Sequence, residues 1–327
     1  MPTTLEIAVI CGGPSTEHEV SLRTAAMVIK NLDRKKYKPT LIVIKKNGLW
    51  KFGLKKSIEI GRAVDELKAF DFAFVAMHGV FGEDGRIQAL LEWIGAPYSG
   101  SGVLSSAMAM DKGISNDLYR AIGMHVPRYA VLNKNDQKKK YNFEFPAVVK
   151  PIDGGSSVGV SIVRSKKELQ KGIRNVFNGN KQVMIQKFIE GREFTCGMLE
   201  DKNGKAFALP PTEIIPKTSK FFDYKAKYNV GGSQEITPAN LSKPMTKKLQ
   251  AIALKAHAAL GCSGMSRSDF ILKGSTFYIL ETNTIPGMTQ TSLLPQAAKA
   301  AGIEFSEMLD LIIFAGLRRH LREICYS

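Results

Sequence analysis

The chain contains 327 residues, of which 44% are hydrophobic and 23% charged, and these values are ordinary for a globular protein of two or three domains. No apolar run approaches the roughly 18 to 20 residues that a membrane-spanning helix needs, so we expect no membrane partner. The four cysteines form no CxxC pair and the N-terminal residues carry no export signal, which together indicate a reducing cytoplasm.

The net charge of +16 makes nucleic acid a partner class to consider. The lysines are dispersed along the chain, however, and do not alternate with aromatic residues in a base-stacking pattern. Most of them therefore fit solvated faces and loops, and part of the excess can attract an anionic nucleotide. We expect no nucleic-acid partner.

The first predicted unit is a strand, a glycine turn and a helix. Residues 5–10 form a short apolar strand, Gly12 and Gly13 end it, and Ser21 begins a helical pattern. This order is typical of a doubly wound sheet, whose ligands lie at the carboxyl ends of the strands. The pattern GGxSxExEVS is not GxGxxG, so a dinucleotide is not implied. Further strands are predicted at 41–44 and 72–77.

A second polar cluster, in HGVFGEDG, follows the strand predicted at 72–77. It contains His78, Glu83 and Asp84 in a tight glycine loop, and a helix is predicted after it at 87–93. Two interpretations of His78 stay open, a site residue or a hydrogen-bonded structural histidine. A turn-rich stretch at 97–102 marks the first domain boundary.

The third block is a Gly/Ser loop between two predicted strands. Strand residues 147–149 lead to Lys150, the loop covers 154–159, and a second strand covers 160–163. Backbone N–H groups and hydroxyls of such a loop can bind phosphate oxygens, and a lysine adds a point charge. The alternative is a flexible hairpin with an exposed lysine. A Walker A motif is absent.

Two later segments are less specific. The run VMIQKFIEGREF predicts a strand that leads into a linker, which can offer backbone groups to an adenine edge and a carboxylate to a ribose. Residues 217–237 are long, polar and rich in lysine and aromatic residues, which indicates an active-site lid rather than a packed element. A disordered loop is the alternative.

The stretch FYILETN carries the most specific pattern in the chain. Glu281 and Asn283 are two residues apart on a predicted strand, so their side chains point to the same side. Asp269, in SRSDF, can supply a third oxygen ligand from a neighbouring strand. Hard oxygen ligands of this kind suit Mg²⁺, which commonly shares its shell with nucleotide phosphates. The alternative is an edge strand whose polar residues face solvent.

Eight segments together carry a resemblance to the ATP-grasp D-alanine–D-alanine ligases, from about residue 5 to 315. They are GGPSTEHEVSL, HGVFGEDG, PYSGSGVLSSAMAMDK, VVKPIDGGSSVGVS, GREF, FFDYKAKY, SRSDF and ETNTIPGMTQTSL. The resemblance implies an α/β protein with an ATP-grasp fold, an N-terminal Rossmann-like (pre-ATP-grasp) domain, and three α/β domains in all. These domains are 1–102 for substrate binding, 103–186 as the central ATP-grasp subdomain, and 187–327 as the C-terminal subdomain with lid loop 212–237.

The same resemblance implies a reaction. The carboxylate of one D-alanine attacks the γ-phosphate of ATP, and the amine of a second D-alanine then displaces phosphate from the D-alanyl phosphate. The product, D-alanyl-D-alanine, enters peptidoglycan precursors. The implied cofactors are ATP and two Mg²⁺ ions, with Mn²⁺ able to take their place. Relatives are commonly homodimers, so a homodimer is expected.

The residue roles implied by the resemblance fall into four groups. The metal ligands are Asp269, Glu281 and Asn283. The nucleotide-binding residues are Lys112, Lys150, Ser156, Ser157, Gln186, Lys187, Ile189, Glu193, Phe221 and Lys227. The substrate-binding residues are Glu17, His78, Arg267, Ser292 and Leu293. The catalytic residues are Glu17, Ser156, Tyr228, Arg267 and Gly287, of which the first three form a hydrogen-bonded set and the last two face the developing oxyanion.

Two alternatives to this function remain. The first is a D-alanyl-D-serine ligase, because the pocket difference at the second site is subtle, whereas the intact FFDYKAKY argues for an amine over D-lactate. The second is a catalytically inactive ATP-grasp nucleotide-binding protein, against which the intact metal, phosphate and oxyanion residues argue. The family commonly has Glu at the adenine hinge where this chain has Gln186, whose oxygen still accepts from an adenine amino group without charge.

Overall fold

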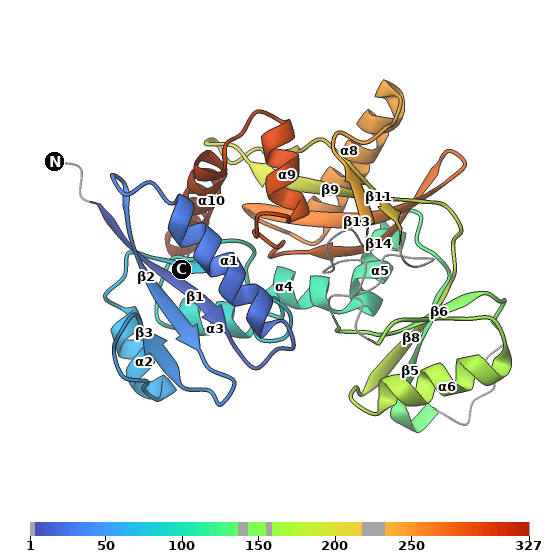
Figure 1. Cartoon of the computed structure of the whole chain (residues 1–327), viewed down its shortest axis with the longest axis horizontal. Helices are drawn as coiled ribbons and strands as arrows, with labels where there is room; N and C mark the ends of the chain where they lie inside the picture. The colour runs from blue at the N-terminus through green and yellow to red at the C-terminus, as the bar shows by residue number, and fades with distance from the viewer. Residues whose placement is uncertain (1–3, 137–142, 155–158, 218–232, 327) are drawn as a thin grey trace.

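The structure is a computed structural model that describes residues 4–136, 143–154, 159–217 and 233–326. Three sheets follow one another along the chain, with the N-terminal sheet at one end of the molecule and the small central sheet at the other (Figure 1). Among the described residues, none of the helices combines the length and the apolar character needed to cross a bilayer.

The N-terminal sheet has the strand order β3-β2-β1-β4, in which β1, β2 and β4 are parallel and β3 is antiparallel. Its elements are β1 (Leu5–Gly12), α1 (His18–Asn31), β2 (Tyr37–Ile44), β3 (Trp50–Phe52), α2 (Ile60–Leu67), β4 (Phe72–Val75) and α3 (Arg86–Trp93). The strands and the helix predicted in this region are confirmed. The first helix begins at His18 and not at the predicted Ser21, because its first turn is polar and lies outside the apolar period.

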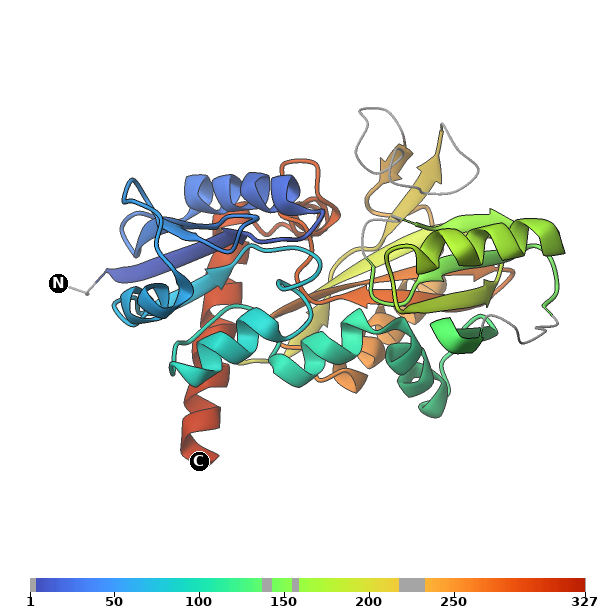
Figure 2. The same cartoon turned by 90° about the horizontal axis from the view of Figure 1, so that it is seen from below.

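The small sheet has the order β5-β8-β6-β7 and is antiparallel throughout. Its elements are β5 (Tyr129–Asn133), the 3₁₀ turn Lys134–Asp136, β6 (Ala147–Pro151), β7 (Ser161–Val163), α6 (Lys166–Phe177) and β8 (Gln182–Lys187). The helix α6 lies along this sheet (Figure 2) and packs against β6, β7 and β8. The predicted hairpin around the Gly/Ser loop is confirmed.

The large sheet has the order β12-β11-β9-β13-β14, with β10 paired to β9. Its strands are β9 (Arg192–Glu200), β10 (Ala206–Ala208), β11 (Thr212–Pro216), β12 (Ser233–Ile236), β13 (Met265–Lys273) and β14 (Thr276–Asn283). The helices around it are α4 (Val103–Met110), α5 (Lys112–Ala121), α8 (Lys243–Ala259), α9 (Leu293–Ala300) and α10 (Phe305–Tyr326). The end of the predicted lid differs from expectation, since residues 233–236 pair with β11 as a strand.

The hydrophobic cores do not follow the order of the chain. One core joins the N-terminal sheet to residues of β9, β13, α9 and α10, and α10 contacts both α1 and β4. A second core packs α4, α5 and α8 against β9, β13 and β14. The small sheet and α6 have a third core of their own. The two helices that follow residue 102, α4 and α5, therefore pack with the large sheet, and the predicted division at 102 and 186 stays a prediction.

A buried histidine in the second core makes the fold sensitive to acid. His257 is 3% exposed, contacts Ser266 Oγ through Nδ1 at 2.8 Å, and burial lowers its pKa from 6.5 to about 4. The unfolded chain therefore takes up this proton first as the pH falls. We expect acidification from pH 6.5 to 4 to cost the parent on the order of 3 kcal/mol of unfolding free energy through this group.

Urea unfolding at several pH values checks this, with His257→Gln as the variant and His125→Gln, at an exposed histidine, as the matched control. His257→Gln should flatten the pH dependence in that window, and His125→Gln should leave it unchanged. Equal slopes in the parent and His257→Gln would contradict the assignment.

Candidate active site

A β-bulge in β14 aims the side chain of Glu281 away from the hydrophobic core. Phe270 pairs with Ile279, whereas Asp269 pairs with Glu281, so Leu280 is an extra residue in the ladder. Without it, alternation would turn Glu281 to the side of Ile279, which is fully buried in the second core. A bulge reverses the alternation of the residues after it and re-aims their side chains. The polar face of β14 therefore begins at Glu281.

Four polar residues form two opposed pairs on the face created by the bulge. Arg267 lies opposite Asn283, and Asp269 lies opposite Glu281. Residues two apart on a strand share a side, so all four side chains face the same way. The edge position of β14 matches one alternative for this strand, but Glu281 and Asn283 are half-buried and line a pocket.

A short hydrogen-bonded chain orients Arg267 and Asp269. Arg267 Nη1 donates to Thr195 Oγ1 at 2.8 Å and also to Asp269 Oδ1, while Thr195 Oγ1 donates to Asp269 Oδ1 at 2.7 Å. Thr195 lies on β9, opposite Asp269 of β13. Arg267, Asp269 and Thr195 therefore lie on two adjacent strands. The guanidinium is thereby held at the pocket wall.

The oxygen ligands on this face suit a hard divalent cation whose coordination shell is completed by other ligands. Asp269 and Glu281 supply carboxylate oxygens, and Asn283 Nδ2 is buried without a hydrogen-bond partner. Exchanging the amide oxygen and nitrogen of Asn283, which are hard to distinguish, would turn a carbonyl oxygen to that position. Among the described residues, no group of three or more His, Cys, Asp or Glu side chains is arranged to hold a metal ion by itself.

Two lysines extend this site toward the small sheet. Lys112 is the first residue of α5, whose N-terminus is capped by Asp111 through the N–H groups of Gly113 and Ile114. Lys112 Nζ donates to Gly154 C=O at 2.6 Å and lies 3.5 Å from Glu281 Oε2. Lys150, on β6, is 8% exposed, which argues against the alternative of an exposed lysine.

The predicted adenine hinge lies at the end of β8. Gln186 is buried and its Nε2 makes no hydrogen bond, so its amide is available to a ligand edge. Lys187 Nζ pairs with Glu144 Oε2 at 2.6 Å, so this ammonium already has a carboxylate partner. Ile189 and Glu193 follow, the first between the strands and the second on β9.

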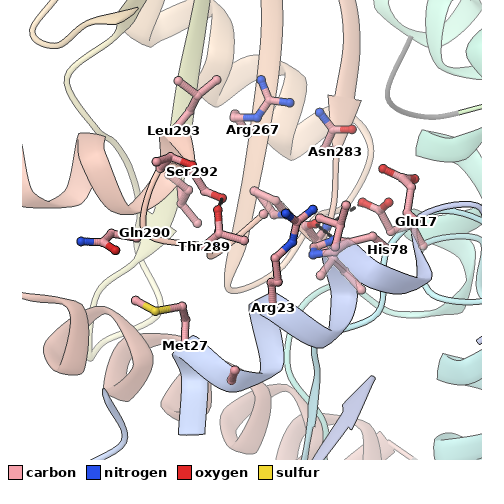
Figure 3. Close-up of a pocket in the computed structure, with 18 of the residues that line it drawn as sticks. Glu17, Arg23, Met27, His78, Arg267, Asn283, Thr289, Gln290, Ser292 and Leu293 are labelled. Carbon is pink, nitrogen blue, oxygen red and sulfur yellow. Dashed lines mark hydrogen bonds between the residues drawn. The ribbon is translucent and has the colours of Figure 1, made fainter. Parts of the chain in front are cut away.

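A pocket of about 520 Å³ lies between α1, the ends of β13 and β14, and the start of α9 (Figure 3). A smaller cavity of about 30 Å³ lies beside Lys112 and Gly154. Glu83, Glu281 and Asn283 line both spaces. The larger pocket and the cavity beside Lys112 therefore meet at these side chains.

His78 is a buried structural histidine in this pocket wall. Its Nδ1 donates to Ile285 C=O at 3.1 Å, because a carbonyl can only accept, and Nε2 then accepts from the Thr24 hydroxyl at 2.8 Å. Burial lowers the pKa of His78, and the charge of Glu17 opposes that effect, so the ring is neutral. Both ring nitrogens thus have protein partners, and the substrate-binding role expected for His78, which lines the pocket, stays a prediction.

Glu83 lies next to His78 and is neutral near pH 7. Withdrawal from solvent, together with the charge of Glu17, raises the pKa of Glu83 to about 8. Its carboxyl accepts the N–H of Gly79 at 2.7 Å and the N–H of Ile285 at 3.3 Å. The sequence placed Glu83 in a polar cluster but assigned it no role.

Glu17 enters the pocket from the start of α1. Its N–H donates to Ser15 Oγ at 3.0 Å, and its carboxylate lies close against the backbone of Gly79. A Cβ at Gly79 would lie 2.6 Å from Glu17 Oε2 and from Ser15 Oγ, so this approach requires glycine. The two other members of the predicted hydrogen-bonded set, Ser156 and Tyr228, lie outside the described residues, as do Ser157, Phe221 and Lys227.

The opposite wall of the pocket is the start of α9. Thr289 N–H donates to Ser292 Oγ at 2.9 Å, and the two hydroxyls are 2.8 Å apart. Ser292 is the N-cap of α9 but makes no capping bond with its side chain, so the first N–H groups of the helix, beginning at Leu293, remain for an anion. Gly287 lies against Ser292, because a Cβ there would approach its hydroxyl to 2.9 Å.

Sequence reasoning missed several residues that line this pocket. Arg23 and Met27 lie on the face of α1 that begins at Glu17, and Figure 3 shows the Arg23 side chain rising from α1 into the pocket. Glu235 reaches the same space from β12. The helical spacing of four residues places Arg23 and Met27 on one face, which the sequence pattern alone could have indicated, whereas Glu235 required the pairing of β12 with β11.

The fold and site define an ATP-grasp protein, in which a small antiparallel sheet with a buried lysine faces a large sheet with acidic residues at its edge. Family models described as D-ala D-ala ligase N-terminus and C-terminus match residues 6–63 with 54–101 and residues 118–314. The chain belongs to the D-alanine–D-alanine ligase family.

Individual relatives agree along the whole chain. A D-alanine–D-alanine ligase from Leptospira interrogans is 40% identical, over 97% of this chain and 99% of the relative. The crystal structure of a D-alanine–D-alanine ligase from Bacillus anthracis complexed with ATP is 38% identical with a TM-score of 0.82, covering 98% and 99% of the two chains. The VanG D-Ala:D-Ser ligase from Enterococcus faecalis is 31% identical with a TM-score of 0.84, covering 96% and 100%.

The approach of Glu17 to Gly79 gives a sharp test of the site. Gly79→Ala places a methyl group against the Glu17 carboxylate, and we expect D-alanine-dependent turnover to fall roughly 10- to 100-fold, because small displacements of positioned groups are costly. The matched control is Gly95→Ala, since Gly95 has the same backbone φ, +68° against +69°, but no atom within 4 Å of a Cβ.

Steady-state kinetics and urea unfolding of both variants check this prediction. Both should lose on the order of 1 kcal/mol of stability from the left-handed backbone. Only Gly79→Ala should lose activity, and an equal loss in Gly95→Ala would show that strain alone is responsible.

Proposed function

We propose that the protein joins two D-alanines into D-alanyl-D-alanine at the expense of ATP, for peptidoglycan precursors. The observation that carries this proposal is the meeting of two spaces at Glu83, Glu281 and Asn283. A pocket sized for small amino acids thereby opens directly onto the phosphate-binding residues. Transfer of a phosphoryl group from nucleotide to a bound carboxylate requires this arrangement, since such reactions depend mainly on positioning and charge neutralisation.

The nucleotide is proposed to lie between the small sheet and the large sheet. Gln186 offers its unpaired amide to the base, Glu193 its carboxylate to the ribose, and Lys112 and Lys150 their ammonium groups to the phosphates. Asp269, Glu281 and Asn283 would hold two Mg²⁺ ions, which neutralise phosphate charge when bound. Support for ATP comes from the relative solved with ATP.

The first substrate is proposed to lie between α1 and β13. Glu17 would bind its ammonium, because it is the carboxylate that α1 presents to this pocket. Arg267 faces the same space and would hold the carboxylate in line for attack on the γ-phosphate. A guanidinium fixed by Thr195 and Asp269 can then stabilise the oxyanion that develops in the second step, together with the N–H of Gly287.

The second substrate is proposed to lie at the start of α9. The Ser292 hydroxyl and the Leu293 N–H would bind its carboxylate, aided by the positive end of the helix. If Thr289 donates both its N–H and its hydroxyl to Ser292 Oγ, the single Ser292 proton is left for the substrate. The second amine is then directed at the acyl carbon held by Arg267.

Four further expectations remain predictions. Ser156 and Tyr228 are proposed to join Glu17 in a hydrogen-bonded set, and Phe221 and Lys227 to cover the nucleotide, although all four lie outside the described residues. A homodimer and a cytoplasmic location are likewise expected from the family. A D-alanyl-D-serine product is the second candidate, supported by the likeness to the D-Ala:D-Ser ligase.

Phosphate release from ATP with Mg²⁺, with products identified by mass, tests the proposed function. We expect release with D-alanine and formation of the dipeptide, and little release with no amino acid or with L-alanine. Mixtures of D-alanine with D-serine or D-lactate decide the second substrate. ATP binding without release under all of these conditions would favour the non-catalytic alternative, and preferential D-alanyl-D-serine formation would favour the second candidate.

The metal role of the acidic face is tested by Glu281→Gln. This change keeps the shape of the side chain but removes a charged oxygen ligand, so we expect turnover to fall by roughly 10² or more and the Mg²⁺ needed for half-maximal rate to rise. Activity of the parent should disappear with EDTA and return with Mg²⁺. A variant with parental rate and parental Mg²⁺ dependence would exclude Glu281 as a ligand.

A further inference from the structure

The backbone of Ile285 is held from both sides by the loop that follows β4. His78 Nδ1–H donates to the Ile285 carbonyl at 3.1 Å, and the Ile285 N–H donates to Glu83 Oε1 at 3.3 Å. These bonds join parts of the chain that are 207 and 202 residues apart in sequence. The backbone N–H and C=O of Ile285 are thus both hydrogen-bonded to side chains of the loop that follows β4.

The two side chains are themselves anchored at their far ends. His78 Nε2 accepts from the hydroxyl of Thr24, on α1, at 2.8 Å, and Glu83 Oε2 accepts from Gly79 N–H at 2.7 Å. Thr24 is fully buried and His78 is nearly so. Neither side chain can leave Ile285 by rotating without also breaking its second bond, so the connection from α1 to Ile285 is rigid.

Ile285 occupies a sensitive place in the chain. It lies two residues after Asn283, the proposed metal ligand, and two residues before Gly287, the proposed oxyanion donor. Its side chain is buried in the core that joins the N-terminal sheet to the large sheet. The residue between Ile285 and Gly287 is a proline, whose fixed φ couples the position of one peptide group to the next. Movement of Ile285 would therefore move both functional groups.

Resting on the proposed ligase function, we propose that His78 and Glu83 are positioning residues that together clamp the peptide groups of Ile285. The clamp sets the distance of Asn283 and Gly287 from Glu17, which comes from the start of α1. It thereby fixes the position of Asn283 and Gly287, which are proposed to act on the acyl group, relative to Glu17, which is proposed to bind the first amino acid. Its contribution is to geometry, since displacements near 1 Å can cost about 10² in rate.

A clamp has a kinetic signature that differs from a substrate contact. Loosening it should lower kcat, because the transition state needs the groups of both sheets in register. The KM for ATP should change by less than about threefold, because the hydrogen bonds of Glu83 go to the backbone N–H groups of Gly79 and Ile285 and not to the lysines or the glutamine proposed to bind the nucleotide. Phosphate release per dipeptide should rise, because an acyl phosphate that is poorly aligned with the second amine reacts more with water.

The variants are Glu83→Leu, which removes both acceptors, and Glu83→Gln, which keeps a single acceptor oxygen for Gly79 or Ile285. The matched control is Asp84→Asn, because Asp84 lies in the same loop but binds only N–H groups of that loop and Arg86. We expect kcat to fall roughly 10- to 100-fold in Glu83→Leu, less in Glu83→Gln, and not in Asp84→Asn.

Hydrogen exchange of the Ile285 amide measures the clamp without reference to activity. Its exchange should accelerate roughly tenfold in Glu83→Leu and stay parental in Asp84→Asn. If Glu83→Leu does not fold, Glu83→Gln carries the test, since the amide of Gly79 or of Ile285 must then exchange faster. This readout also separates the two proposals, because a parent that makes no dipeptide would refute the ligase function while exchange still decides the clamp.

Three outcomes would overturn the clamp. They are parental exchange at Ile285 in a folded Glu83→Leu, faster exchange there with parental kcat, and a loss of kcat in Asp84→Asn that matches the loss in the Glu83 variants.

Discussion

The extra residue in β14 is the constraint on which the site depends. A regular ladder would place the side chains of Phe277, Ile279 and Glu281 on one face, and the fully buried aromatic and aliphatic contacts of the first two would carry a carboxylate into the core. Such burial of an unpaired charge is costly. The bulge at Leu280 lets one strand serve the core with its first half and the pocket with its second half. Thr282, now on the core side, is accommodated by hydroxyl contacts with Ser268 and Tyr119.

The charges around this face are arranged for exchange of partners. Asp269 is paired with Arg267, and Glu281 lies near Lys112, so each acidic residue among the proposed metal ligands has a cation beside it. Both cations are also proposed to bind substrate groups. Arrival of nucleotide with its metal ions would transfer the carboxylates to the metal and release the cations to phosphate and to the amino-acid carboxylate. These two ion pairs neutralise Asp269 and Glu281 in the folded protein, which limits the repulsion between Glu281 and the other carboxylates of the pocket.

The sequence predicted the α/β class, most strands, and the shared side of Glu281 and Asn283, because period-two alternation, glycine turns and polar strand ends are local signals. It did not predict the bulge, since an extra residue is visible only through the partner strand. Likewise, the hydrogen bonds of His78 to Thr24 and Ile285 could not be predicted, because these partners are distant in the chain. The packing of α4 and α5 with the large sheet was missed for the same reason, and so was the strand at 233–236.

The separate core of the small sheet has a consequence for how specificity can evolve. The walls of the pocket proposed to bind the amino acids come from the N-terminal and large sheets, which share one core. A substitution that shifts one wall therefore also shifts the other. The nucleotide hinge belongs to a sheet with its own interior. Substitutions that retune recognition of the nucleotide, such as Gln at position 186, can therefore accumulate independently of those that select the amino acid. One half of the active site can diverge while the other is conserved.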